Sequence, residues 1–432
     1  MLLNKIECFD NIINTEKKIA ILGTGWIAKL IYLYLQYKQV AAENIYIYIF
    51  GNESHEILKW DIPVRFLDYD FRGPVIIAEK EEKGRLIENQ YDGQGTIYSI
   101  SENLKNTIDA HMMRVLPEQY EKEVMCGRKE ELDALMTIKI GKRIDEISEK
   151  EDFPIFEGIE IETINRCNGS CSFCPVNRYD DTRLITKMSE ELFYKIISQL
   201  KDLNYSGRVA LYSNNEPFLD SRTVEFAEYA RYELLNAFLY IFTNGSLLDL
   251  EMFRRIINVL DFMCLDLYYD SEEAVFSDNI LEILDYCEKN ELCDKVMIQT
   301  INRSAIRNNR GGGSKNRHVI YRPQAPCILP FTQMIVRPDG KLSLCCNDPL
   351  GEYTMGDLAK TSISDAWNSS AYAHIRSDNG IRKTRQNIEK CKLCDNYSTT
   401  NQNGNMIFTK EQIADSWLAY RDISHNGKSK ND

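Results

Sequence analysis

The sequence predicts an α/β protein whose largest part is a partial (βα)6 barrel of the TIM type. Between residues 158 and 337, six apolar strand-like segments alternate with helical segments, which is typical of a parallel barrel. Earlier β-branched runs, the first at residues 18–22, predict a separate Rossmann-like α/β domain. Seven of the thirteen cysteines form spaced clusters, three after the first barrel strand and four between residues 327 and 394, which predicts two metal sites.

The Rossmann-like domain is expected over residues 1–110. The strand at 18–22 is followed by GTGWIA at 23–28 and then by a helical segment. A dinucleotide site would also need an acidic residue after the second strand, where this chain has Gly51 and Asn52. The motif therefore favours a module that binds a nucleotide-sugar, a partner protein or no ligand. Further strands are expected at 45–50, 74–79 and 96–100.

The barrel is expected over residues 151–326, after a charged helical connector at 111–150. Because the residues that follow parallel barrel strands form the active site, motifs at those positions carry the functional argument. The six strands are expected at 158–164, 208–213, 237–243, 262–269, 295–301 and 332–337. Helices between them are expected at 189–203, 223–235 and 250–260.

Charge and hydropathy exclude several classes of protein. The net charge of −13 disfavours free nucleic acid as a partner, since phosphate binding needs a positive surface. No apolar run approaches the roughly 20 residues of a membrane span. The N-terminus lacks the pattern of a signal peptide, so a cytoplasmic location is expected.

The first barrel strand is followed by NRCNGSCSFCPVNR, in which Cys167, Cys171 and Cys174 are spaced C-x3-C-x2-C. A [4Fe–4S] cluster normally has four thiolate ligands, so three would leave one iron open. An open metal position marks a site that binds a ligand. The alternative is a zinc knuckle with a distant fourth ligand, but no such ligand is near, and a strand–loop–helix setting does not suit a knuckle.

This spacing, with Phe173 before the third cysteine, resembles the signature of the radical S-adenosylmethionine (SAM) superfamily, C-x3-C-x-aromatic-C. The resemblance covers about residues 155–400. It implies that the open iron chelates SAM and that one electron from the cluster cleaves it to a 5′-deoxyadenosyl radical. The cofactor then carries the chemistry, and the protein orients it.

Further landmarks of the family stand at the ends of the next three strands. NNEP at 214–217 occupies the place of G-G-E-P, TNG at 243–245 ends the third strand, and Asp266 occupies the ribose-contact position. Two asparagines replace the glycines, while Glu216 is retained and is implied to bind the SAM ammonium group. The implied SAM-binding residues are Phe173, Asn214, Asn215, Glu216, Thr243, Asn244 and Asp266.

A second cysteine set lies in a C-terminal domain expected over residues 327–400. Gly340 suits a tight turn that folds two of these cysteines together. Four thiolates also suit a zinc ribbon, but the set is similar to the shortened "twitch" form of the SPASM extension, which implies an auxiliary [4Fe–4S] cluster. Cys346 is either a bystander or a thiol that donates hydrogen near the substrate. The set is Cys327, Cys345, Cys391 and Cys394, and a helix and tail follow over 401–432.

The segment 302–322 carries six cations and no acid in this acidic chain, and three glycines make it pliable. It is either a solvated loop or a clamp in which Arg307, Arg310 and Arg317 bind an anionic substrate.

Together these features predict a radical SAM oxidoreductase that abstracts hydrogen from a carbohydrate or nucleotide-sugar. The auxiliary cluster would accept an electron or orient the substrate, and flavodoxin or ferredoxin would supply electrons. One alternative is a maturase that epimerises or cross-links a ribosomal peptide. A second is a non-catalytic iron–sulfur redox sensor, which the open-iron motif and Glu216 disfavour.

Overall fold

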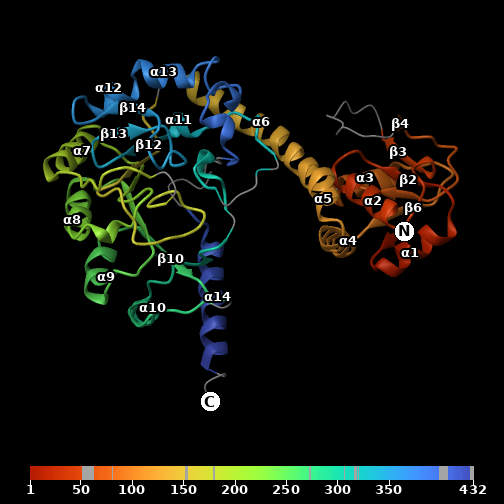
Figure 1. Cartoon of the computed structure of the whole chain (residues 1–432), viewed down its shortest axis with the longest axis horizontal. Helices are drawn as coiled ribbons and strands as arrows, with labels where there is room; N and C mark the ends of the chain where they lie inside the picture. The colour runs from red at the N-terminus through yellow and green to blue at the C-terminus, as the bar shows by residue number, and fades with distance from the viewer. Residues whose placement is uncertain are drawn as a thin grey trace. The chain divides into compact units, whose positions relative to one another are not determined.

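The computed structural model describes residues 1–50, 63–79, 81–150, 154–178, 181–271, 274–305, 307–315, 319, 321–397 and 407–428. It contains two compact units, Met1–Met136 and Thr137–Asp432 (Figure 1). The predicted α/β class with parallel strands is confirmed in both units. The finer division into five segments stays a prediction. No helix among the described residues has both the length and the apolarity needed to cross a bilayer.

The first unit is built on a six-stranded parallel sheet with the order β1-β6-β5-β2-β3-β4. The order reverses between β2 and β5, as in doubly wound folds. Alternate residues of β2 enter different cores: Ile19 and Ile21 pack with α1, α2 and α4, whereas Ala20 and Leu22 pack on the other face. The strands are β1 (Leu2–Leu3), β2 (Ile19–Leu22), β3 (Ile45–Ile49), β4 (Val64–Phe66), β5 (Val75–Ile77) and β6 (Ile97–Ile100). The helices are α1 (Ile6–Thr15), α2 (Trp26–Tyr37), α3 (Glu81–Gln90), α4 (Glu102–Val115) and α5 (Pro117–Tyr120). Helix α6 (Cys126–Ser148) begins in this unit and ends in the second.

The glycine turn before α2 is filled by a side chain of the same unit. The backbone N–H of Trp26 donates to Glu131 Oε1 at 3.0 Å. A Cβ on Gly25 would lie 2.1 Å from the same oxygen, so a larger residue there would displace the Glu131 carboxylate. A carboxylate at the N-terminus of a helix is favourable, because the helix dipole is positive there.

The second unit is built on an eight-stranded sheet with the order β11-β10-β9-β8-β7-β12-β13-β14. The strands from β11 to β12 in this order run parallel to their neighbours, and β13 and β14 are antiparallel. They are β7 (Gly158–Ile161), β8 (Arg208–Ala210), β9 (Phe238–Thr243), β10 (Phe262–Tyr269), β11 (Val296–Asn302), β12 (Gln333–Val336), β13 (Lys341–Ser343) and β14 (Thr354–Asp357). The main helices between the strands are α7 (Glu190–Asp202), α8 (Thr223–Glu233), α9 (Leu250–Ile257) and α10 (Asp278–Lys289), and α11 (Leu329–Thr332), α12 (Ile363–Trp367) and α13 (Ser370–Arg376) follow.

The sixth parallel strand does not continue the series from the fifth. Instead, β12 pairs with β7, and the turn at Gly340 (φ 82°) leads from it into β13, as the sequence predicts. The long connection between β11 and β12 allows the chain to cross from one end of the series of parallel strands to the other. Because β12 does not pair with β11, β11 is an edge strand of the partial barrel.

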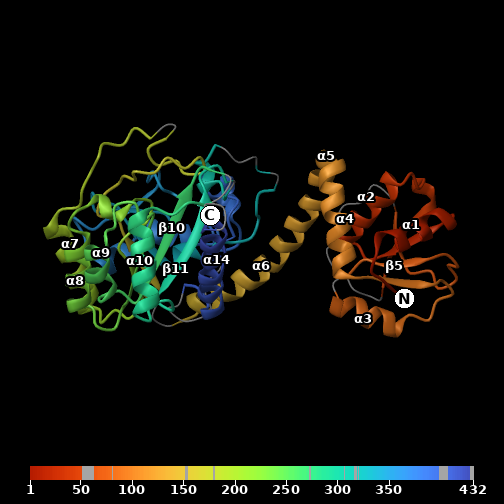
Figure 2. The ribbon, with the colours of Figure 1, turned by 90° about the horizontal axis from the view of Figure 1, so that it is seen from below.

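Helix α14 (Lys410–Lys428) covers that edge (Figure 2). The indole Nε1–H of Trp417, which is 2% exposed, donates to Val296 O at 2.8 Å. Ser416 Oγ accepts from the N–H of Ile298 at 3.2 Å. The helix thus satisfies backbone groups of a strand that would otherwise be open to pairing.

Candidate functional site

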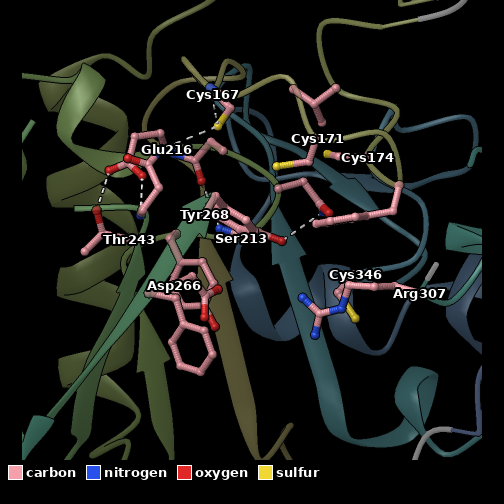
Figure 3. Close-up of a pocket in the computed structure, with 18 of the residues that line it drawn as sticks. Cys167, Cys171, Cys174, Ser213, Glu216, Thr243, Asp266, Tyr268, Arg307 and Cys346 are labelled. Carbon is pink, nitrogen blue, oxygen red and sulfur yellow. Dashed lines mark hydrogen bonds between the residues drawn. The ribbon is translucent and has the colours of Figure 1, made fainter. Parts of the chain in front are cut away.

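A cavity of about 440 Å³ lies at the C-terminal ends of β7, β8, β9 and β10 (Figure 3). In Figure 3 the three cysteines of the loop after β7 line one side of this cavity, and Asp266 and Cys346 line the opposite side. Nearly every residue that the sequence singles out for SAM or substrate therefore meets here, whereas Arg317 lies outside the described residues. The predicted residues that line the cavity are Cys167, Cys171, Phe173, Cys174, Asn214, Asn215, Glu216, Thr243, Asn244, Asp266, Arg307, Arg310 and Cys346.

The cysteine loop has the form of a cradle for a sulfur-ligated group. A Cβ on Gly169 would lie 3.3 Å from Cys167 Sγ and 4.0 Å from Cys171 Sγ, so the glycine keeps the space between them open. Burial raises the pKa of the Cys167 thiol to about 12 and that of Cys171 to about 11. Metal binding deprotonates such thiols outright.

The donor set suits a cluster rather than one ion. No three His, Cys, Asp or Glu side chains among the described residues are close enough to ligate a single metal ion. Each thiolate of a [4Fe–4S] cube binds its own iron, so its sulfurs need not converge on one point. The three cysteines of the loop therefore fit a cluster with one iron left for a further ligand.

Glu216 joins the ends of β8 and β9. Its carboxylate accepts from the Thr243 hydroxyl at 2.7 Å, from the Asn244 N–H at 2.8 Å and from the Phe218 N–H at 3.2 Å. Burial raises the pKa of this carboxyl, and the three hydrogen bonds oppose that rise. Asn244 also reaches back to the cysteine loop, with Nδ2 3.9 Å from Cys167 Sγ.

The two asparagines that replace glycines in NNEP make different contacts. The N–H of Asn214 donates to Glu162 Oε1 at 2.6 Å, and its Oδ1 accepts from Arg310 at 2.7 Å. Asn215 Nδ2 is buried and has no hydrogen-bond partner among the described residues. A buried donor beside the cavity is costly unless a ligand accepts its hydrogen bond.

A second, small cavity of about 20 Å³ is lined by all four cysteines of the C-terminal set. Cys345 lies two residues after β13, the second strand of the hairpin with β12. The turn at Cys391–Leu393 places Cys391 and Cys394 at the same cavity. Burial is the main cause that raises the pKa values of the Cys345, Cys391 and Cys394 thiols. Four thiols around one cavity can supply every ligand of a [4Fe–4S] cluster, whereas the loop after β7 supplies only three.

Two family models match these two sites. Residues 161–304 match the Radical SAM superfamily, and residues 327–395 match SPASM, an iron–sulfur cluster-binding domain. The chain is a radical SAM enzyme with a SPASM domain. A radical SAM domain binds a [4Fe–4S] cluster and SAM, and a SPASM domain binds auxiliary iron–sulfur clusters.

Similar proteins include a dehydrogenase. The radical SAM enzyme is 24% identical over 247 residues to the S-adenosyl-L-methionine-dependent 2-deoxy-scyllo-inosamine dehydrogenase of Niallia circulans, a match that covers 56% of this chain and 94% of the relative. The crystal structure of BtrN in complex with AdoMet and 2-DOIA superposes with a TM-score of 0.50 at 21% identity. That match covers 58% of this chain and 97% of BtrN and shows a shared fold.

Residues 309–312 of the basic segment make specific contacts with other parts of the second unit. The N–H of Asn309 donates to Asp395 at 2.7 Å, and its side chain donates to Leu393 O at 2.6 Å. Gly311 has φ 60°, and a Cβ there would lie 2.6 Å from Asn347 O. A Cβ on Gly312 would lie 3.3 Å from Leu393 Cβ, so the two glycines allow close packing against Asn347 and the CKLC segment. Of the arginines, Arg310 is partly buried, whereas Arg307 is exposed and lies 5.5 Å from the centre of the Phe173 ring.

The radical SAM cavity and the four-cysteine cavity share a thin wall. Arg310 lines the first cavity, and its neighbour Gly311 lines the second. In the same way Cys346 lines the first and Cys345 the second. The two sites are thus separated at these points by adjacent residues of one chain.

Several cavity residues were missed by sequence reasoning. Glu160 could have been found from the sequence, because GIEIETI places acids at alternate positions of an otherwise apolar segment. Phe408 had no such signal: it precedes α14 and stacks on Phe242, with ring centres 6.0 Å apart. The missed lining residues include Glu160, Tyr212, Ser213, Phe242, Tyr268, Gln299, Asn308 and Phe408.

If Glu216 contacts the SAM ammonium group, Glu216→Gln should weaken SAM binding about tenfold and leave the iron content unchanged. The loss of charge removes roughly 1–2 kcal/mol from that contact. Binding of SAM to the anaerobically reconstituted protein can be measured by equilibrium dialysis. Asp220→Asn is the matched control, because Asp220 is a buried carboxylate of the same loop that pairs with Arg222. An unchanged SAM affinity in Glu216→Gln would contradict this role.

Proposed function

We propose that this radical SAM enzyme dehydrogenates a hydroxyl-bearing carbon of a carbohydrate-type substrate and passes the released electron to an auxiliary [4Fe–4S] cluster. The observation that carries the proposal is the shared wall: a substrate in the larger cavity lies beside the four-cysteine cavity, at Arg310 and Cys346. The relative from Niallia circulans, a dehydrogenase of 2-deoxy-scyllo-inosamine by name, favours a small polyhydroxylated substrate.

Each cofactor has a proposed set of ligands in the chain. In this proposal, Asn215 Nδ2 supplies a buried donor and Glu216 a buried carboxylate for SAM, and Asp266 contacts its ribose. The cluster that binds SAM is held by Cys167, Cys171 and Cys174, and the auxiliary cluster by Cys327, Cys345, Cys391 and Cys394.

The cluster and SAM, when bound, supply the 5′-deoxyadenosyl radical that abstracts a hydrogen atom, and flavodoxin or ferredoxin supplies the initiating electron. The chain's own residues hold the substrate and exclude water. Phe242 and Phe408 form an apolar wall, and Arg310 offers a fixed cation held by Asn214. The exposed Arg307, with Arg317, would bind an anionic group if the substrate is nucleotide-linked.

A second candidate is an epimerase, and the observation that favours it is the thiol of Cys346 in the cavity. This thiol could donate a hydrogen atom to the substrate carbon radical. The sulfur radical left behind would then need one electron and one proton from a one-electron reductant. The product would be an epimer and not a ketone.

The test is an anaerobic assay of the reconstituted enzyme with SAM and a panel of cyclitols, aminocyclitols, sugars and nucleotide-sugars. We expect one substrate to yield about one ketone per 5′-deoxyadenosine, because each radical is used once. Deuterium on the oxidised carbon should appear in 5′-deoxyadenosine. An epimer in place of the ketone would select the second candidate. Stimulation by a ribosomal peptide alone would contradict both.

A further inference from the structure

Glu160 is a buried carboxylate that lines the radical SAM cavity from β7, and it is 8% exposed. The hydroxyl of Ser213 and the amide of Gln333 both donate to it, one to each oxygen. These contacts come from the loop after β8 and from β12, the strands on either side of β7. The carboxylate is therefore held in a fixed orientation at the cavity wall.

The other ionisable groups of the cavity are less suited to accept a proton. Glu216 already accepts three hydrogen bonds. Asp266 lies near Arg307 and accepts from the thiol of Cys264 at 3.5 Å. Arginine stays protonated in proteins. Burial also keeps the lining phenols protonated, because it raises the pKa values of Tyr212 and Tyr268.

Glu160 also lies at the end of the cavity where an electron would leave. Its charge interacts with Arg310 and with Cys346. These are the two residues whose chain neighbours, Gly311 and Cys345, line the four-cysteine cavity. The hydroxyl proton and the electron that the substrate loses can therefore depart toward the same side of the cavity.

We propose that the Glu160 carboxylate accepts the hydroxyl proton of the substrate during its oxidation, an inference that rests on the proposed function. The C–H bond breaks and its hydrogen atom goes to the 5′-deoxyadenosyl radical. The O–H bond breaks and its proton goes to Glu160. The carbon–oxygen double bond forms as one electron passes to the auxiliary cluster, so a secondary alcohol becomes a ketone. Ser213 and Gln333 orient the carboxylate.

This role has a pH signature. Burial raises the pKa of Glu160 to about 7, and the Ser213 hydrogen bond and the nearby Arg310 and Arg208 oppose the rise. The carboxylate accepts a proton only when ionised, so ketone formation should fall as the pH decreases through about 7. The groups that face Glu160 from the surrounding elements are Arg208, Tyr212, Ser213, Tyr240, Arg310, Gln333 and Cys346, and Glu162 follows the end of β7.

The experiment compares Glu160→Gln with Glu162→Gln in the reconstituted full-length enzyme. Glu162 is a matched control: it is buried directly after the end of β7 and burial raises its pKa to about 7, but it does not line the cavity. Ketone, 5′-deoxyadenosine, iron content and the melting temperature are measured, and the ratio of 5′-deoxyadenosine to ketone is followed between about pH 6 and pH 8.

Glu160→Gln should form ketone at least about 100-fold more slowly, while SAM cleavage and iron content persist, so the ratio should rise. Glu162→Gln should keep the wild-type ratio. Glu160→Asp should recover part of the ketone formation.

Three results would overturn the proposal. The first is a one-to-one ratio at the wild-type rate in Glu160→Gln. The second is equal loss of SAM cleavage and ketone in that variant, which would assign a structural role. The third needs no variant: a wild-type ratio that is constant across the pH range. Failure of the proposed function is distinguishable, because the wild-type enzyme would then form no ketone from any substrate.

Discussion

Replacing Cys167, Cys171 and Cys174 together by alanine should remove about half of the iron and abolish SAM cleavage. Two [4Fe–4S] clusters correspond to about eight irons, and the loop after β7 would hold four of them. Without these thiolates no open iron remains to chelate SAM. Iron analysis and a 5′-deoxyadenosine assay on the reconstituted protein measure both effects.

Cys287→Ala is the control for the triple variant. Cys287 is a fully buried thiol of α10 and lines neither of the two cavities described above, so its removal should leave all the iron in place. Full iron content in the triple variant would contradict the assignment of the loop. Stoichiometric zinc with only about four irons in the wild-type protein would contradict the auxiliary cluster and support the zinc ribbon.

The double variant Cys391→Ala and Cys394→Ala should lose the other half of the iron and all ketone formation. These cysteines line the four-cysteine cavity and not the radical SAM cavity, so the first cluster should persist and SAM cleavage should continue. Electron paramagnetic resonance of the reduced protein should then show one cluster signal instead of two. Ketone formation at the wild-type rate would show that the substrate electron does not pass through the SPASM domain.

Much of the site was predictable because its signals are local. The three cysteines and Phe173 lie within eight residues, and NNEP, TNG and Asp266 each follow or end a strand. The carboxyl ends of parallel strands meet at one edge of a sheet, so motifs at successive strand ends come together without knowledge of long-range contacts.

The rest depends on contacts between distant segments, which periodicity does not reveal. The pairing of β12 with β7 joins residues about 175 positions apart, as in Gln333 opposite Gly158. The hydrogen bond between Trp417 of α14 and Val296 of β11 joins residues 121 positions apart. The sequence left Arg310 open between a solvated loop and a clamp for an anionic substrate. Its contact with Asn214 appears only when the strands are assembled.

The carboxylate of Glu131 changes the meaning of the glycine turn at residues 23–28. A phosphate group that entered the turn would meet a negative charge already bound to the Trp26 N–H, and it could bind only after that side chain moved away. The Glu131 carboxylate is thus the anion at the N-terminus of α2. In other proteins this glycine pattern indicates nucleotide binding. Here its helix N-terminus binds the Glu131 carboxylate and so connects α2 with α6. A search by motif alone would assign a nucleotide to a position that Glu131 already occupies.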